Sequence, residues 1–363
     1  MNVAIDARKY RDFGIGTYIR NLAACFDLDE EDRFTYFVAP EDQDHISRTH
    51  RGTTIVNRSG KYSFAELWTL SLRANREGVS LFHAPHYTLP FALSMRRVVT
   101  IHDVIHLRFP EYFSPVQRAY ARFMIGHACR AADAVIVDSE FAGRELVRCS
   151  SCPAEKIHVI PLGVSGSFAP AQDGVPANEF RKKYRVDRDF LLYVGSLKPH
   201  KNVPALLEAF AGVTSRPDVE IVFVGERLDD RGPLRALCER TGIWNRVRSL
   251  GWLPEADLIG AYHAAIAVVL PSLYEGFGFP VLEAMACGTP VIGSNAASIP
   301  EVMGDTGILF NPSVEKEIAD AISAVLVDST LRSRLREEGL RRAKLFSWSL
   351  CAERTLHLYR SLT

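Results

Sequence analysis

The sequence predicts an α/β protein built from two Rossmann-like domains, each with a parallel sheet, that face one another across a cleft. Three observations lead to this prediction. The chain has 363 residues, which is enough for two domains with separate cores. Short β-branched runs alternate with amphipathic helical stretches, as in α/β proteins. The alternation restarts after a stretch rich in Gly, Pro and Ala between Gly163 and Asp187, which places the domains at 1–170 and 171–345.

The first half contains seven short apolar runs that predict strands. Helical patterns lie between them and are clearest over 18–26, 64–76 and 116–131. The strands are expected within 2–7, 34–38, 53–56, 79–84, 98–103, 133–139 and 157–163.

The second half repeats this organisation. Helices are expected from Val203, from Pro233, near Leu258, from Pro280 and in three stretches after Pro312. The strands are expected within 190–196, 219–225, 247–252, 265–272 and 290–294.

Two strand-turn-helix segments, 133–147 and 265–284, resemble one another, and only the second has paired glutamates and a proline. Ligands bind at the carboxyl ends of parallel strands, where such turns occur. The second copy is therefore expected on the ligand side.

Charge and apolar content exclude several classes of protein. Lys+Arg and Asp+Glu both total 43, so there is no basic field to attract nucleic acid. The first residues lack the pattern of a signal peptide, and no apolar run reaches the roughly 20 residues of a membrane span. The seven scattered cysteines indicate a reducing compartment. The cytoplasm is the expected location.

The stretch 272–292 contains the chain's most distinctive chemistry. Gly276 and Gly278 let the backbone approach a ligand, and Pro280 suits the first turn of a helix. We expect a phosphate cradle made by the N–H groups at this helix start. The N–H groups are expected from Phe277, Gly278, Phe279 and Val281, and Gly276 is expected at the donor through its close backbone approach.

Glu275 and Glu283 flank this cradle with seven residues between them. A carboxylate repels a phosphate but is a strong acceptor for neutral hydroxyl groups. Sugars on both sides of a diphosphate satisfy both acids, which predicts a nucleotide-sugar ligand.

The stretch "EGFGFPVLE" resembles the E-x7-E signature of the retaining GT-B glycosyltransferases of group 1, which include glycogen synthases and bacterial mannosyltransferases. The resemblance spans nearly the whole chain. It implies that Glu275 holds hydroxyls of the donor sugar and that Glu283 holds the nucleotide ribose. It also implies that the last segment, 346–363, is a helix that crosses back to the first domain.

The same resemblance assigns Lys201, in "YVGSLKPHKN", to the donor diphosphate. The family usually has an arginine five residues earlier, where this chain has Ser196. Ser196 can donate a neutral hydrogen bond, and Lys198 or Arg227 can restore the charge. The residues alone do not choose among these three.

Gly14 and Gly16 follow the first strand and resemble a dinucleotide fingerprint, but Ile19 replaces its third glycine. The family resemblance instead implies that this loop lies near the donor phosphates. By the same resemblance, the base pocket lies near Trp252 and Leu253, and backbone contacts there leave the base unidentified.

The resemblance places His102, at the end of a buried strand, on the donor sugar. A metal site is the alternative, because His102 and His106 are four residues apart and His83 and His86 precede them. No carboxylate or cysteine is evidently placed to complete such a site, and the family needs no catalytic metal. We therefore expect neither a metal nor a cofactor.

Two further motifs are interpreted as structural. Cys149 and Cys152 form a single CxxC without the second pair that zinc needs. Asp27 and Asp29 resemble a metal-binding DxD, but they lie in an acidic polar loop and are expected to be solvated.

Arg118 and Arg122 lie four residues apart beside aromatic residues in a helical stretch. Such a face can rest on anionic lipid, and many proteins of this family act on lipid-linked acceptors. An ordinary half-buried helix is the alternative.

The expected reaction moves a hexose, mannose from GDP-mannose, to a hydroxyl of a saccharide or lipid-linked acceptor with retention of configuration, in surface polysaccharide, lipopolysaccharide or glycolipid assembly. His102, Lys201 and Glu275 are the expected catalytic residues. Two alternatives stay open: an epimerase or hydrolase acting on a nucleotide sugar, and a non-catalytic subunit that binds one.

Overall fold

The computed structural model describes residues 1–29, 31–58, 64–171, 173–229 and 231–363. The chain forms two compact units. Unit 1 comprises Met1–Gly163 with Ser347–Thr363, and unit 2 comprises Val164–Phe346. Composition alone had placed the domain boundary a few residues later, at 170/171.

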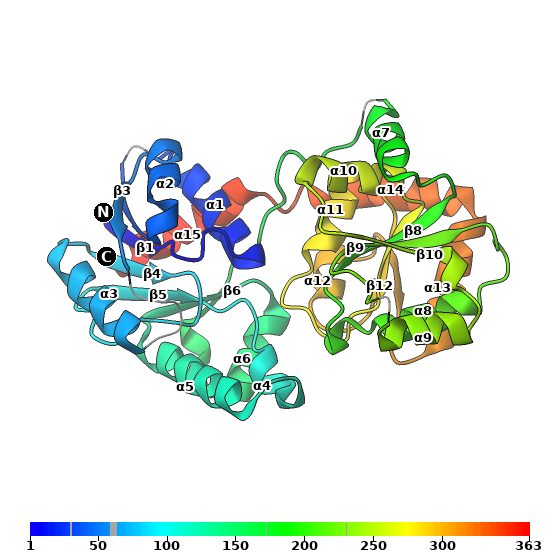
Figure 1. The fold of residues 1–363 in the computed structure, drawn as a ribbon. Helices are drawn as coiled ribbons and strands as arrows, with labels where there is room; N and C mark the ends of the chain where they lie inside the picture. Colours follow the sequence, from blue (N-terminus) through cyan, green and yellow to red (C-terminus); the bar gives the residue numbers. More distant parts are fainter. Residues whose placement is uncertain (30, 59–63, 172, 230) are drawn as a thin grey trace. The chain divides into compact units, whose positions relative to one another are not determined.

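The described residues of unit 1 form a parallel sheet of seven strands in the order β3-β2-β1-β4-β5-β6-β7. Helices lie on both faces of this sheet (Figure 1). The strands are β1 (Asn2–Asp6), β2 (Arg33–Val38), β3 (Thr53–Val56), β4 (Leu81–Ala84), β5 (Arg96–Thr100), β6 (Ala134–Val137) and β7 (Ile157–Val159). The helices are α1 (Phe13–Phe26), α2 (Gln43–Thr49), α3 (Phe64–Arg76), α4 (Ile105–Arg108), α5 (Pro115–Ala131), α6 (Glu140–Ser150) and α15 (Trp348–Leu362), with short 3-10 turns η1 (Pro40–Asp42), η2 (Pro110–Tyr112) and η3 (Ala154–Lys156).

The described residues of unit 2 form a parallel sheet of six strands in the order β10-β9-β8-β11-β12-β13, again between helices (Figure 1). The strands are β8 (Phe190–Gly195), β9 (Glu220–Gly225), β10 (Val247–Gly251), β11 (Ala267–Leu270), β12 (Val291–Ser294) and β13 (Ile308–Phe310). The helices are α7 (Val175–Tyr184), α8 (Val203–Ala211), α9 (Pro233–Arg240), α10 (Glu255–Ala264), α11 (Phe279–Cys287), α12 (Ile299–Met303), α13 (Glu315–Val327) and α14 (Ser329–Ala343), with 3-10 turns η4 (Pro199–Lys201) and η5 (Trp244–Arg246).

The two sheets share one topology. Counted from the start of each unit, the first six strands follow the order 3-2-1-4-5-6 in both. The strand order reverses between β1 and β4 in unit 1, and between β8 and β11 in unit 2. Open α/β sheets bind ligands at such a switch point, beyond the carboxyl ends of the strands. The fold therefore singles out the loops after β8 and β11.

Both cores are built from the same kind of residue. Strands β6 and β11 are buried along their whole length, as expected for central strands covered on both faces. Large side chains such as Phe82 in unit 1 and Phe223 in unit 2 are fully buried. Each core is separate, which agrees with two independently packed sheets.

The C-terminal helix α15 belongs to unit 1 and packs on α1. Tyr359 on α15 lies 2.5 Å from Nδ1 of His83 on β4. The chain passes so close to itself here that a Cβ at Gly163 would lie 2.1 Å from the backbone nitrogen of Trp348. Only glycine fits this approach without a shift of the backbone.

Candidate active site

The loops after β8 and β11 meet through two side chains that are far apart in the sequence. Lys201 ends the η4 turn after β8, and Glu275 lies in the loop between β11 and α11. Lys201 Nζ lies 2.6 Å from Glu275 Oε1, and the two side chains are only 20% and 11% exposed. The N–H of Leu273 also donates to the His200 carbonyl at 2.8 Å. The topological switch point thus brings together two predicted site residues.

Two buried serines hold the loop around Glu275. Ser272 Oγ donates to the same Glu275 oxygen at 2.7 Å. Ser298 Oγ lies 3.0 Å from the Glu275 carbonyl and 2.8 Å from the Phe277 carbonyl. Since Ser298 holds the carbonyls of this loop, the opposite, N–H side of the backbone is left for another partner.

The start of α11 has the geometry of an anion-binding helix end. Gly278 precedes the helix with a φ of +106°, which favours glycine, and Pro280 lies in the first turn. Within the described residues, the N–H groups of Phe277 and Gly278 make no hydrogen bond. The prediction for Val281 was wrong, because its N–H donates to the Gly278 carbonyl at 3.1 Å.

The aromatic residues of this loop pack against one another and against Phe346 within unit 2. Phe277 is buried, and its ring meets those of Phe279 at 5.7 Å and Phe346 at 6.0 Å. Gly276 separates Phe277 from Glu275 and is partly buried. Packing of Phe277 fixes the turn on one side while Ser298 fixes it on the other.

Glu283 lies in α11 with its Oε2 2.7 Å from the hydroxyl of Tyr262, which donates to it from α10. Burial raises the pKa of the Glu283 carboxyl to about 7, although the Tyr262 hydrogen bond acts in the opposite direction. Among the described residues, Oε1 has no hydrogen-bond partner. This acid can therefore accept a hydroxyl of a ligand, and its charge changes near neutral pH.

The loop after β8 is shaped by hydrogen bonds to its backbone. Tyr193 donates its hydroxyl to the Ser196 carbonyl at 2.6 Å. The Leu197 N–H donates to Glu226 Oε2 at 2.8 Å. Lys198 is exposed. These contacts order the segment that leads to Lys201.

Arg227, the other predicted source of positive charge, is exposed and lies against the end of β10. A Cβ at Gly251 would lie 2.7 Å from Arg227 Nε. Arg227 is thus beside the segment of Trp252, which is 60% exposed, and Leu253, which is partly buried. This position is that of the predicted base pocket.

In unit 1, the ends of β5 and β6 place an imidazole beside a carboxylate. His102 Nδ1 lies 2.7 Å from Asp138 Oδ2, and the Asp138 side chain is 2% exposed. Burial lowers the pKa of His102, but the charge and hydrogen bond of Asp138 outweigh it and the pKa is raised. The ring of Tyr18 meets His102 edge-on at 5.0 Å.

The metal alternative does not fit the neighbouring histidines. His83 Nε2 lies 2.7 Å from Thr100 Oγ1, and its Nδ1 is next to the Tyr359 hydroxyl, so neither nitrogen is available as a ligand. Burial lowers the pKa of His83 to about 3, which keeps this imidazole neutral. In the part of the chain that the structure describes, no three His, Cys, Asp or Glu side chains converge on one point.

Gly14 and Gly16 both lie in the first turn of α1, which begins five residues before the predicted start. A Cβ at Gly16 would lie 2.4 Å from the Tyr10 carbonyl, whereas a Cβ at Gly14 would meet nothing within 4 Å. Packing against the preceding loop thus explains the glycine at position 16.

The acidic motif was expected to be solvated, and this was wrong. Asp27 lies 2.7 Å from His50 Nδ1, and Asp29 accepts from Arg360 on α15 at 2.8 Å. The two acids stabilise unit 1. Cys149 and Cys152 are free thiols. The Cys152 thiol lies 3.9 Å from the Pro153 carbonyl.

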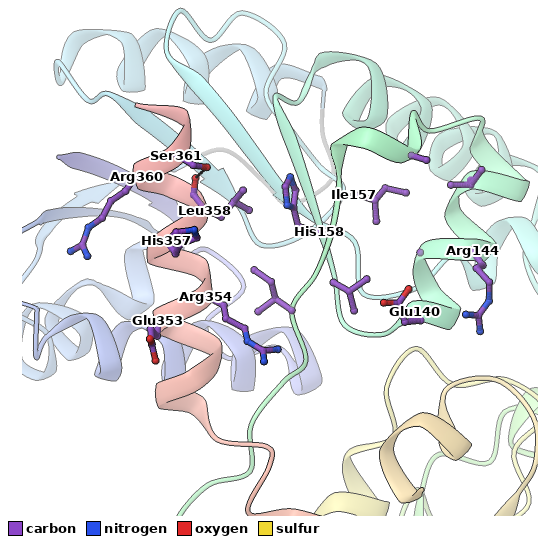
Figure 2. A pocket seen from close by; sticks show the side chains of 15 residues that line it. Glu140, Arg144, Ile157, His158, Glu353, Arg354, His357, Leu358, Arg360 and Ser361 are labelled. Atoms are coloured by element: carbon purple, nitrogen blue, oxygen red, sulfur yellow. Dashed lines mark hydrogen bonds between the residues drawn. The ribbon is translucent and has the colours of Figure 1, made fainter.

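A cavity of about 1150 Å³ opens between α6, β7 and α15 in unit 1. Figure 2 shows Glu140 and Arg144 on one side of it and Arg354 and His357 of α15 on the other. None of the predicted site residues lines this cavity.

Sequence reasoning missed four polar residues of the site. Three of them act through a partner that is distant in the sequence, and Ser272 lies three residues before its partner Glu275. The four residues are Asp138, Tyr262, Ser272 and Ser298.

Comparisons with known proteins agree with this geometry. Residues 176–342 match the family model for glycosyl transferases group 1, and residues 14–167 match that for glycosyltransferase family 4. O-antigen chain mannosyltransferase B of Escherichia coli is 33% identical over 284 residues, covering 78% of this chain and 74% of that protein. The chain belongs to the group 1 glycosyltransferases. The predicted resemblance to bacterial mannosyltransferases is confirmed.

This glycosyltransferase also resembles longer proteins. The serotype-specific mannosyltransferase WbdA of Escherichia coli is 29% identical over 277 residues, which cover 74% of this chain but 34% of that protein. The chain therefore spans about a third of WbdA's length.

Solved structures confirm the predicted GT-B fold. Sucrose-phosphate synthase from Thermosynechococcus elongatus has a TM-score of 0.81 at 23% identity, and the superposition covers 100% of this chain and 99% of the synthase chain. Anabaena Alr3699/HepE in complex with UDP and glucose has a TM-score of 0.79 at 22% identity and covers 100% of both chains. Among the described residues, no helix has the length and apolar character to cross a membrane.

Proposed function

We propose that this glycosyltransferase transfers mannose from GDP-mannose to a hydroxyl of a saccharide or lipid-linked saccharide, with retention of the anomeric configuration. One observation carries the proposal. Lys201 and Glu275 are in contact at the switch point of unit 2, beside the start of α11. A cation, a helix N-terminus and a carboxylate in one place suit a diphosphate that is linked to a sugar.

The relatives support mannose as the transferred sugar and polysaccharide assembly as the process. O-antigen chain mannosyltransferase B and WbdA carry that activity in their names. Glycolipid or lipopolysaccharide acceptors have the same hydroxyl chemistry. Acceptance of GDP-mannose in place of UDP-glucose is the point that the first experiment tests.

The residues of unit 2 suggest how transfer proceeds. The bond between the anomeric carbon and the diphosphate oxygen breaks, and Lys201 and the α11 N-terminus stabilise the negative charge that develops on the leaving group. The acceptor oxygen bonds to the anomeric carbon on the same face, and its proton passes to the departing phosphate. Glu275 holds the donor sugar, and Glu283 holds the ribose. For His102, which lies in unit 1, the family resemblance is the basis of its proposed role at the donor sugar. The reaction needs no metal or further cofactor.

We also propose that unit 1 contacts anionic lipid at the cytoplasmic face of the membrane. Trp68 and Leu72 on α3 and Phe123 on α5 are 54%, 57% and 49% exposed. Phe91 connects them, because its ring lies 5.9 Å from Trp68 and 6.2 Å from Phe123. Helix α5 also contains three arginines and no acid, which suits an anionic surface.

A thermal-shift panel tests the donor. A ligand that binds the folded state raises the melting temperature. GDP-mannose and GDP are expected to raise it, and UDP-glucose and dTDP-glucose are expected to leave it unchanged at equal concentration. A shift with UDP-glucose alone would refute the proposed donor.

Product analysis tests the reaction. With GDP-mannose and a mannoside acceptor, NMR should show an α-linked product and free GDP, with no change on addition of a chelator. A β-linked product would contradict retention. Consumption of GDP-mannose without any acceptor would indicate an epimerase or hydrolase, and no release of GDP would indicate a binding subunit.

Vesicle flotation tests the lipid contact. The protein is expected to float with vesicles that contain phosphatidylglycerol and not with phosphatidylcholine vesicles. Replacing both Trp68 and Phe123 by serine should abolish flotation while the melting temperature is kept. Equal binding of the variant and the unmodified protein would refute this surface.

A further inference from the structure

We infer that Asp138 is a positioning residue that fixes the direction and the protonation of His102, an inference that rests on the proposed role of His102 at the donor sugar. No sequence pattern points to Asp138, which lies in the loop between β6 and α6. The inference follows from where the two neighbouring strands end.

The backbone places the two side chains at one edge of the sheet. Strands β5 and β6 are parallel neighbours, with Thr100 opposite Ile136. The pairing continues for one more residue, since the N–H of Ile101 donates to the Ile136 carbonyl at 2.9 Å. His102 and Asp138 follow at the carboxyl ends of the two strands, and their side chains meet at 2.7 Å.

This contact determines which ring nitrogen carries a proton. Asp138 Oδ2 can only accept when it is ionised, so Nδ1 of His102 must be the donor. Nε2 then points away from Asp138. It makes no hydrogen bond of good geometry among the described residues, although the Pro85 carbonyl acts on the ring and contributes to the raised pKa of His102. A charged imidazole presents an N–H donor at this position, and a neutral one presents an acceptor.

The pair is costly for a purely structural contact. Asp138 is 2% exposed, and its Oδ1 has no hydrogen-bond partner among the described residues. A buried carboxylate oxygen without a partner costs free energy, whereas an apolar residue of similar size would not. The arrangement is explained if the carboxylate serves the imidazole beside it.

Other groups around the pair do not replace Asp138. His83, on the neighbouring strand β4, is neutral, and both of its ring nitrogens are hydrogen bonded, one to Thr100 and the other to Tyr359. Asp103 follows His102 and raises its pKa less than Asp138 does. Three further titratable groups lie near the pair: His86 after β4, Tyr18 on α1 and Cys351 on α15. The charges of Asp6, Lys9 and His106 affect the pKa of the neighbouring histidines His83 and His86.

The structure determines in which direction the charge of Asp138 shifts the pKa of His102. With Asp138 present, the pKa of His102 lies above 6.5, and the imidazolium is lost as the pH rises through this raised value. Asparagine at position 138 can still accept from Nδ1 but has no charge. Burial then dominates, and the pKa of His102 should fall by about one unit or more.

The test uses Asp138→Asn, with Asp133→Asn at the opposite end of β6 as the matched control. In ligand-free protein with labelled histidines, NMR should show His102 titrating above 6.5 in the unmodified protein and Asp133→Asn, and at least about one unit lower in Asp138→Asn. In the transfer assay, the loss of kcat/KM at high pH should move down by the same amount in Asp138→Asn alone.

Each outcome decides the inference. Identical His102 titrations in the unmodified protein and Asp138→Asn would overturn it, as would a shifted titration with an unshifted activity profile. If Asp138→Asn does not fold, the inference is tested on the unmodified protein alone. A His102 that titrates below pH 6.5 in that protein would overturn the inference. The NMR measurement needs no donor, so failure of the proposed transfer reaction is distinguished from failure of the pairing.

Discussion

Replacing Glu283 by glutamine should change both stability and nucleotide binding in a way that depends on pH. The carboxyl has a pKa of about 7 in the folded protein and an ordinary value of 4.5. Because the folded value is raised, the stabilisation linked to the protonated form is complete below pH 4.5 and is lost as the pH rises through 7. Glutamine has the same shape and no such titration.

The size of the stability effect follows from the shift. A difference of one pKa unit corresponds to about 1.4 kcal/mol, so the shift of Glu283 corresponds to about 3 kcal/mol. This is an upper limit, because part of the side chain stays in contact with solvent. In denaturant unfolding, Glu283→Gln should match the unmodified protein at pH 4.5 and be up to about 3 kcal/mol more stable at pH 8.

Protonation of Glu283 should weaken nucleotide binding, whereas it stabilises the folded protein. The ribose hydroxyl donates to the ionised carboxylate, so the Kd of GDP should rise below pH 7 by up to about tenfold per pH unit. Calorimetry of GDP binding from pH 5.5 to 8.5 measures this. The phosphates of GDP titrate in the same range, and Glu283→Gln isolates their contribution because it lacks the acid. The exposed Glu239 on α9 supplies the control substitution Glu239→Gln. Parallel pH profiles for Glu283→Gln and the unmodified protein would refute the ribose assignment.

Three further substitutions test other parts of the site. Lys201→Ala should lower kcat by on the order of 10² to 10³, because it removes one preorganised positive charge, and unchanged turnover would remove Lys201 from the diphosphate site. Gly16→Ala should lower the free energy of unfolding by about 1–3 kcal/mol, because its Cβ meets the Tyr10 carbonyl. Gly14→Ala, where the space is open, should raise it by about 0.5–1 kcal/mol, and equal effects at the two positions would contradict the packing argument. Ser298→Ala should cost about 1–3 kcal/mol in thermal or denaturant unfolding, because the buried Phe277 carbonyl and the partly buried Glu275 carbonyl share the Ser298 hydroxyl as donor; no loss would show that they find another donor.

The sequence was sufficient to predict the two sheets because buried parallel strands leave a strong local signal. The twelve expected strands are all present. Strand β13, Ile308–Phe310, was missed because three residues are too few to show a pattern. Helix α1 was expected to begin at residue 18 because glycines at 14 and 16 are poor helix formers, but packing at Gly16 outweighs that propensity.

Site residues were predictable only where they lie in a local motif that can be recognised in the sequence. The turn before α11 could be recognised from Gly276, Gly278 and Pro280, whose backbone roles follow from their residue types. Val281 was assigned wrongly because a single extra hydrogen bond in the first turn uses its N–H. Asp138, which is 36 residues from His102, becomes its neighbour only through strand pairing.

The acidic motif at Asp27 and Asp29 is a second case in which partners distant in the sequence could not be predicted. Its residues looked solvated because their partners, His50 and Arg360, are distant in the sequence. Side-chain contacts of this kind depend on the tertiary fold and have no local signal. The same reasoning applies to Tyr262, whose hydroxyl reaches Glu283 from a different helix.

A crystal structure with GDP bound tests the central claim most directly. The pyrophosphate should lie at the start of α11, within hydrogen-bond distance of the Phe277 or Gly278 N–H, with Lys201 turned from Glu275 toward a phosphate oxygen. The nucleotide bound elsewhere, with Lys201 still paired to Glu275, would contradict the account.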